Sequence, residues 1–169
     1  MLLHGPHRNI SLKTIRSILL RYAFDCGISL EFSDLTKSPV YYQQAKTAYR
    51  YGVKEETDRK QHFFRDYYRH SLVDALSKRY APDFFIHPKL YELIHHDAIH
   101  RSQLSETLYQ YLDAYKNINT TAKILHIHRN TLQYRLKKIE EILSISFNDP
   151  PSCHQLHIGL MLLKKTRAF

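Results

Sequence analysis

Side chains that can bond DNA bases are concentrated in a short segment that begins at His128. Arg129 and Asn130 come next, and Gln133 follows one helical turn further along. In the major groove an arginine can bond guanine in two places, and an asparagine or glutamine can bond adenine in the same way. The spacing therefore predicts that these side chains share the exposed front of one helix and contact base edges.

The charges around this segment favour a nucleic acid as partner. Six Lys or Arg and no acid lie between residues 116 and 138. The six are Lys116, Lys123, Arg129, Arg135, Lys137 and Lys138. Because Glu140 and Glu141 follow them, we expect the N-terminal half of this helix to approach the DNA end-on.

The expected DNA-contacting residues cover the first turns of this helix. We expect Thr131 to meet a phosphate, since hydroxyl groups commonly bond phosphate oxygens. Lys138 is expected to contact a phosphate, so its replacement by alanine should weaken binding to all duplexes about equally. The complete expected set is His128, Arg129, Asn130, Thr131, Gln133, Tyr134, Lys137 and Lys138.

Two helices joined by a short turn would hold these side chains in place. Asn117 is expected to cap a first helix over 118–125, and the second helix should start near His128. Apolar residues recur at helical spacing in both. The buried edge of the first helix is Ile118, Ala122 and Leu125; that of the second is Leu132, Leu136, Ile139 and Leu143. This layout predicts a helix-turn-helix, whose second helix enters the major groove.

Three residues near the turn have structural interpretations. His126 stands where such motifs often carry a glycine, so we expect a positive φ there. Ile127 is expected to be the apolar plug of the turn. For Arg135, pairing with an internal carboxylate while its stem packs and contact with DNA are equally plausible.

Patterns in the rest of the chain predict further helices and two strands. Ser11 could cap a helix over 11–26 that Gly27 ends, and Pro39 and Gly52 could bound another. Strands are expected over 28–32 and 62–64, with a loop over 53–60. Helices are expected over 67–80, from Pro88, over 102–115 and over 152–165. The expected inner face of the helix over 67–80 is Tyr68, Leu72, Ala75 and Leu76. Tyr115 is expected to end the apolar stripe of the helix over 102–115. Asp149-Pro150-Pro151 should stop the second motif helix.

The expected fold is mainly α, with a small α+β N-terminal remnant followed by an all-α helix-turn-helix domain. We expect residues 1–64 to form a regulatory segment and residues 65–169 the DNA-binding domain. All strands are expected before about residue 65.

The totals agree with a folded protein that binds polyanions. The chain has 169 residues, 43% apolar and 24% charged, with a formal charge of +9. Cys26 and Cys153 fit no metal or redox spacing, and we expect two reduced thiols. With no apparent signal peptide or membrane span, the protein is expected to be soluble and cytoplasmic.

The segments NINTTAKIL and HIHRNTLQYRLKKIEEI resemble the C-terminal helix-turn-helix of the PucR/CdaR family of bacterial transcription regulators. The resemblance continues upstream through HPKLYELIHHD and LSETLYQYLDAY. The motif also resembles the DNA-binding end of the factor for inversion stimulation. CGISLEFSDLTKSPVYYQQAKTAYRYG resembles the end of the degenerate GGDEF-like middle domain of these regulators.

The family implies a DNA-binding transcription factor, often an activator of catabolic genes, with a separate N-terminal effector-sensing domain. The resemblance includes neither the sensing domain nor the first half of the GGDEF-like domain, so we expect either a fragment or a short regulator whose signal is read elsewhere. Any effector would therefore be sensed by a missing N-terminal domain or by a partner. No GGDEF sequence is present, so cyclic-dinucleotide synthesis is not expected. We expect a homodimer on double-stranded DNA, because helix-turn-helix proteins usually pair on two half-sites.

Two other classes of function remain open. The first is a metal site at one of three histidine groups: His95-His96 with His100 and Asp97, His126-x-His128, or His154-x-x-His157 with Cys153. The second is a non-specific nucleic-acid binder or a helical protein-interaction module. No phosphate loop, serine elbow or paired-carboxylate motif stands out, so we expect no enzyme, no catalytic residue and no cofactor.

Overall fold

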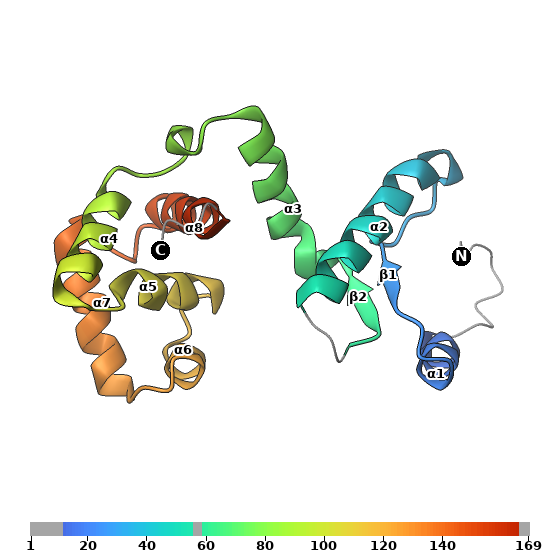
Figure 1. Cartoon of the computed structure of the whole chain (residues 1–169), viewed down its shortest axis with the longest axis horizontal. Helices are drawn as coiled ribbons and strands as arrows, with labels where there is room; N and C mark the ends of the chain where they lie inside the picture. Colours follow the sequence, from blue (N-terminus) through green and yellow to red (C-terminus); the bar gives the residue numbers. More distant parts are fainter. Residues whose placement is uncertain (1–11, 56–58, 166–169) are drawn as a thin grey trace. The chain divides into compact units, whose positions relative to one another are not determined.

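The computed structural model describes residues 12–55 and 59–165, and their contacts divide the chain between Leu72 and Val73 (Figure 1). Within the described residues the elements are eight α-helices, two short strands and two 3-10 turns. Both strands lie before residue 65, so the expected mainly-α fold with a small α+β N-terminal part is confirmed. The expected assignment of residues 1–64 and 65–169 to two functions stays a prediction.

The N-terminal unit is built around a parallel pair of strands. It contains α1 (Leu12–Arg21), β1 (Cys26–Ile28), the 3-10 turn η1 (Leu35–Lys37), α2 (Ser38–Glu55), β2 (Gln61–Phe63) and the start of α3 (Phe64–Arg79). Gly27 stands opposite His62 in the pairing. Parallel strands need a crossover connection, and α2 supplies it and packs on both strands.

Two glycines in this unit permit close approach of the backbone and do not end helices. A Cβ on Gly27 would lie 1.8 Å from the carbonyl oxygen of Ala45, so α2 could not pack on β1. A Cβ on Gly52 would lie 1.9 Å from Nδ1 of His62. The helix ends expected at these glycines were wrong: α1 ends at Arg21, and α2 continues to Glu55.

Other boundaries near these strands also differ from expectation. The first strand covers Cys26–Ile28 and not 28–32, whereas the second, Gln61–Phe63, agrees within one residue. The helical residues 53–55 belong to the expected loop over 53–60. Ser11 and residues 56–58 lie outside the described residues.

The C-terminal unit consists of packed helices. After the 3-10 turn η2 (Pro82–Phe84) come α4 (Lys89–His100), α5 (Leu104–Asp113), α6 (Ile118–Ile124), α7 (Arg129–Leu143) and α8 (Pro150–Lys165). Helix α5 contacts α4, α6, α7 and α8, while α7 also contacts α4 and α6, and α8 also contacts α4 (Figure 1). The fully buried aliphatic residues of this core are Leu90, Leu93, Leu108, Leu132, Ile139, Leu143, Leu156, Leu160, Leu162 and Leu163.

Three expectations about helix faces and ends were wrong. In α3, Tyr68 and Leu72 are 51% and 46% exposed, while Tyr67 and Val73 are buried. Tyr115 lies after the end of α5 with a φ of 53°, and it is 82% exposed because it no longer follows the helical stripe. Helix α7 does not run on to Asp149; Ser144, at a φ of 51°, ends it, and Pro150 begins α8.

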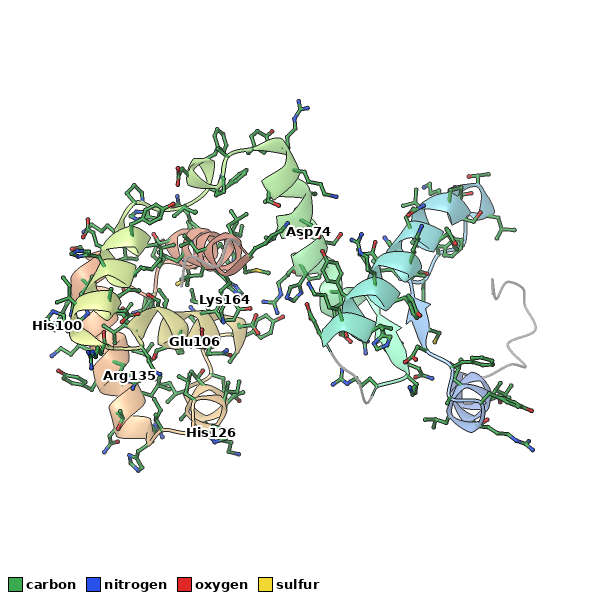
Figure 2. All side chains as sticks on the ribbon, in the orientation of Figure 1. Asp74, His100, Glu106, His126, Arg135 and Lys164 are labelled. Atoms are coloured by element: carbon green, nitrogen blue, oxygen red, sulfur yellow. The ribbon has the colours of Figure 1, made fainter. Side chains whose placement is uncertain are left out.

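A surface ion pair joins α8 to α5, with Lys164 Nζ 2.8 Å from Glu106 Oε2 (Figure 2). Ion pairs at the surface contribute little to the free energy of unfolding, so burial of the apolar core contributes most of the stability of this unit. No helix among the described residues combines the length and the apolar character needed to cross a membrane.

We predict that Leu132→Ala lowers the free energy of unfolding of the C-terminal unit by about 2–5 kcal/mol. Leu132 is fully buried in α7, and its truncation leaves a cavity that rigid neighbouring helices cannot fill. Urea unfolding followed by circular dichroism measures the change. An unchanged midpoint would mean that this face of α7 is not the core face.

Candidate nucleic-acid interface

The first helix of the motif begins with a side-chain cap. Oδ1 of Asn117 accepts a hydrogen bond from the amide of Thr120 at 2.9 Å, which confirms the expected cap. The hydroxyl of the buried Thr121 donates to the carbonyl oxygen of Asn117 at 2.8 Å. These two bonds fix where α6 starts.

The turn between α6 and α7 has the expected conformation. His126 adopts a φ of 53°, as expected where many such motifs carry glycine. The amide of Ile127 then donates to the carbonyl oxygen of Ala122 at 3.0 Å, and Ile127 packs against the core. Ala122 is buried, and its small side chain lets the two helices come close.

His128 has a role at the start of α7 that the sequence analysis did not anticipate. It is the N-cap residue, and its Nδ1 accepts a hydrogen bond from the amide of Asn130 at 3.2 Å. The bond holds the imidazole at the front end of the helix. A histidine so close to the expected start of a helix was the available signal, but histidine is not among the usual cap residues.

The expected base-contacting side chains lie together on the exposed front of α7. Arg129, Asn130 and Gln133 are all exposed, and Tyr134 is 71% exposed. Thr131 and Lys137 are exposed as well. On the opposite side, the stripe Leu132, Leu136, Ile139 and Leu143 is buried as expected. One helix therefore presents hydrogen-bonding groups outward and anchors itself by its other face.

Lys138 is set apart from that front. It is half-exposed, and its Nζ lies 3.9 Å from Oε2 of Glu141. It also lines a groove between α7 and the connection from α4 to α5.

Arg135 has the internal role that was one of its two expected interpretations. Its Nη1 donates to Oγ1 of the buried Thr107 at 3.1 Å, so the partner is a hydroxyl on α5. The hydroxyl of Thr107 in turn donates to the carbonyl oxygen of Gln103 at 2.6 Å. No ion pair between Arg135 and a carboxylate is found within 12–55 and 59–165, contrary to the expected carboxylate partner. This chain of bonds holds α7 at the start of α5.

Asp97 organises the connection from α4 to α5, whereas the sequence suggested it only as a possible metal ligand beside His96 and His100. Its Oδ1 accepts a hydrogen bond from the amide of Leu104, and its Oδ2 accepts one from the amide of Ser105, each at 2.8 Å. The hydroxyl of Ser102 also donates to Oδ1, at 2.6 Å. A carboxylate placed this way caps α5 from the preceding helix. Arg101, at a φ of 50°, turns the chain between the two helices. Helix caps are usually sought next to the helix, so its sequence distance hid Asp97.

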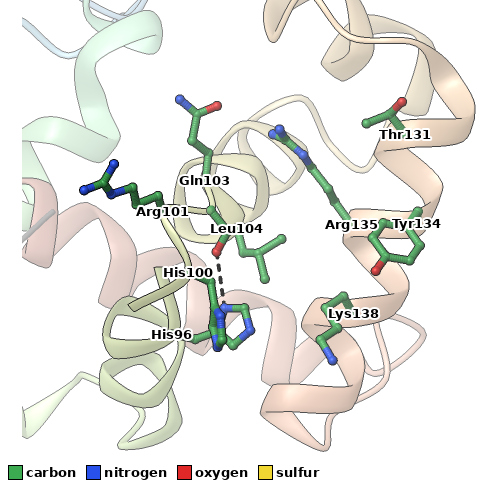
Figure 3. A pocket seen from close by; sticks show the side chains of 10 residues that line it. His96, His100, Arg101, Gln103, Leu104, Thr131, Tyr134, Arg135 and Lys138 are labelled. Atoms are coloured by element: carbon green, nitrogen blue, oxygen red, sulfur yellow. Dashed lines mark hydrogen bonds between the residues drawn. The ribbon is translucent and has the colours of Figure 1, made fainter. Parts of the chain in front are cut away.

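The groove beside this connection has a volume of about 560 Å³ (Figure 3). Nδ1 of His96 lies 3.2 Å from Oγ of Ser102, and the rings of His96 and His100 are 4.3 Å apart between centroids. Burial lowers the pKa of His96, and the charges of His100 and Lys138 lower it further, whereas Asp97 opposes them. The residues that line this α4–α7 groove are His96, His100, Arg101, Ser102, Gln103, Leu104, Thr131, Tyr134, Arg135 and Lys138.

The histidine groups considered as metal sites do not gather enough ligands in the described part of the chain. There, no cluster of three or more His, Cys, Asp or Glu side chains could hold a metal ion. His157 instead lies beside Asp113, with Nε2 3.4 Å from Oδ1. Cys26 and Cys153 are both free thiols, and burial raises the pKa of each.

Residues 104–162 match the family model described as the PucR C-terminal helix-turn-helix domain. The match covers α5, α6, α7 and most of α8, which are the elements that position the candidate interface. This part of the chain is similar to a known helix-turn-helix domain. No solved structure matches the chain.

Similarity to whole regulators extends further along the chain. The DNA-binding transcriptional activator AdeR of Bacillus subtilis (strain 168) is 26% identical over 160 residues, 92% of this chain and 38% of AdeR. The proline-responsive transcriptional activator PutR of the same organism is 42% identical over 64 residues, 38% of this chain and 16% of PutR. The purine catabolism regulatory protein of Bacillus subtilis (strain 168) is 44% identical over 59 residues, 35% of this chain and 11% of that protein. The chain thus spans less than half the length of each of these relatives.

We predict that Asp97→Ala destabilises the C-terminal unit by about 1–3 kcal/mol, because two buried amides at the start of α5 lose their acceptor. Urea unfolding measures the loss. The matched control is Glu92→Ala, which removes an exposed carboxylate from the same helix and should change stability by less than about 0.5 kcal/mol. Equal effects of the two substitutions would contradict the capping role of Asp97.

Proposed function

We propose that the C-terminal unit binds double-stranded DNA in a sequence-specific manner and is the output part of a transcriptional regulator. The observation that carries the proposal is the front of α7, where Arg129, Asn130 and Gln133 stand exposed on a helix whose opposite face is buried. The similarity of residues 104–162 to a helix-turn-helix domain supports it. So do the names of the relatives AdeR and PutR, both transcriptional activators.

In this proposal the N-terminal half of α7 enters the major groove. Arg129 bonds guanine, while Asn130 and Gln133 bond adenine through its N6 and N7 edge. His128 and Tyr134 flank these contacts at the base edges. Thr131, Lys137 and Lys138 contact phosphates and set the register of the helix on the duplex.

The charge distribution along α7 supports an end-on approach. Its exposed cationic residues Arg129 and Lys137 precede Glu140 and Glu141. Oε1 of Glu140 accepts a hydrogen bond from the amide of Phe147 at 2.7 Å. The acidic end would meet the phosphates unfavourably if the helix lay flat along the groove. Affinity should fall steeply with salt, as the net charge of +9 also suggests.

The N-terminal unit is proposed to be part of a degenerate GGDEF-like regulatory domain. The alignment with AdeR covers 92% of this chain, whereas the helix-turn-helix match begins only at residue 104, so the similarity includes residues upstream of the motif. The β1–α2–β2 unit, with its parallel strands, is compatible with a piece of a larger α+β sheet. An effector would then be sensed outside these residues or by a partner.

The regulator is proposed to act in the cytoplasm as a homodimer on DNA. Two copies would place their α7 helices in successive major grooves, about 34 Å apart along the duplex. The operator would accordingly contain two related half-sites. A duplex selected from random sequence by the protein would reveal both the half-sites and their spacing.

We predict that Arg129→Ala weakens binding to the selected duplex by about 1–3 kcal/mol and relaxes the base preference at one position. Arg129 is exposed at the start of α7, so its loss should leave the fold intact. Mobility shift on the selected and scrambled duplexes measures binding, and circular dichroism checks the fold.

Arg79→Ala is the matched control, since it removes an equally exposed arginine from the end of α3. It should leave the base preference unchanged. Equal binding of the wild-type protein to selected and scrambled duplexes would contradict sequence-specific recognition. That result would favour a non-specific nucleic-acid binder, and no duplex binding at all would favour a protein-interaction module.

A further inference from the structure

The α4–α7 groove is lined by cationic side chains and by no carboxylate. Arg101, Arg135 and Lys138 are basic, and His96 and His100 add two imidazole rings. The remaining polar groups that line it include the hydroxyls of Thr131 and Tyr134, whereas the hydroxyl of Ser102 donates to Asp97. A concave surface with this lining favours an anion with several oxygen atoms, because guanidinium, ammonium and hydroxyl groups all donate to it.

Two carboxylates contact residues of this lining, and both are engaged: Oε2 of Glu141 lies 3.9 Å from Nζ of Lys138, and Asp97 caps α5. Both carboxylate oxygens of Asp97 accept backbone amides at the start of α5, and Oδ1 also accepts the hydroxyl of Ser102. Arg101, in contrast, is exposed, and no ion pair holds it among the residues that the structure describes. The positive φ of Arg101 places it at the corner between α4 and α5. The cationic side of the groove is thus held in place by a carboxylate whose own oxygens are occupied.

Repulsion between the cationic groups supports an anionic occupant. The pKa of His96 is lowered, first by burial and then by the charges of His100 and Lys138. A bound anion would offset this repulsion and favour the protonated ring. The anion would thus offset the contribution of His100 and Lys138 to the lowered pKa of His96, whereas burial, its largest cause, would remain.

The position of the groove on α7 identifies the source of that anion. Thr131, Tyr134, Arg135 and Lys138 recur at helical spacing, so they form one stripe of α7 beside the front that carries Arg129 and Gln133. The major groove is about 12 Å wide, and a helix with its side chains is about 10–12 Å across. A helix inserted there has phosphates of the DNA backbone along its sides, where this stripe lies.

We infer that the α4–α7 groove is a phosphate-binding site that holds one phosphate of the DNA backbone beside α7. The inference rests on the proposed function. Lys138, on the α7 side, and Arg101, at the corner between α4 and α5, bond the phosphate oxygens, with His100 as a further donor. Figure 3 shows the Arg101 side chain pointing away from α7, so this contact requires it to turn toward the bound phosphate. Arg135 keeps its hydrogen bond to Thr107, and its positive charge attracts the phosphate without a direct contact. The connection from α4 to α5, which lies outside the two motif helices, thus becomes part of the DNA-binding surface.

Single methylphosphonate substitutions test this assignment, since each one removes the charge of a single phosphate. They are scanned along the selected duplex for the wild-type protein, Arg101→Gln and Lys138→Gln. In the wild type, one position beside the bases contacted by α7 should lose about tenfold in affinity when neutralised. Arg101→Gln should lose about tenfold on the unmodified duplex and nothing further at that position, because the two changes remove the same interaction.

Arg79→Gln is the matched control, since it removes one positive charge from the same unit away from the groove lining. It should keep the full tenfold loss at the neutralised position. Circular dichroism confirms the fold of each variant, and Lys138→Gln repeats the test from the α7 side. The assignment would be overturned if both groove variants bound the unmodified duplex as tightly as the wild type. It would also be overturned if both variants still lost about tenfold in affinity at each phosphate whose neutralisation weakens the wild type. Either result would leave sequence-specific binding intact. A wild-type protein that binds no duplex would remove the proposed function as well.

Inorganic phosphate distinguishes the DNA backbone from a free anion. The ring resonances of His96 and His100 are followed by NMR during a phosphate titration, with duplex binding measured in parallel. Phosphate that shifts these resonances and competes with duplex binding supports a shared site. Phosphate that saturates the groove at millimolar concentration without changing duplex binding assigns the groove to a free anion and contradicts our inference.

Discussion

Burial of one stripe of α7 is the constraint on which the rest of the C-terminal unit depends. Leu132, Ile139 and Leu143 have no exposed surface, and Leu136 has almost none. Because these residues repeat with the period of the helix, their burial fixes the rotation of α7 about its own axis. The residues between them, Arg129 and Gln133 among others, must then face outward. Hydrophobic burial thus decides which side chains are available to a partner.

Rotation alone does not place a helix, and two polar interactions set the position of α7 relative to its neighbours. Arg135 bonds Thr107 near the start of α5, and Asp97 holds that start by two amides. Since α5 packs on both α6 and α7, the two motif helices share one supporting helix. Preorganised helices avoid an ordering cost when a rigid duplex is bound. Residues that need never touch DNA would in this way influence its recognition.

Predictions from the sequence succeeded where one local rule determined the structure. The apolar period of α7, the cap at Asn117 and the positive φ at His126 each follow from neighbouring residues. Predictions failed where distant packing decided. Gly27 appeared to end a helix, yet its missing side chain admits the backbone of α2, and Asp97 caps a helix seven residues away from it. The exposed front of α7 was predictable, whereas the groove beside it needed three elements to be placed together.

Recognition of bases by α7 from the major groove, as we propose, is tested most directly by methylation interference. One reagent, dimethyl sulfate, methylates guanine at N7 in the major groove and adenine at N3 in the minor groove. Partially methylated copies of the selected duplex are separated into bound and free fractions, and the modified positions are mapped. The account predicts that guanine N7 methylation within each half-site blocks binding and that adenine N3 methylation at the same half-site does not. Interference from adenine N3 alone would place the protein in the minor groove and contradict the account.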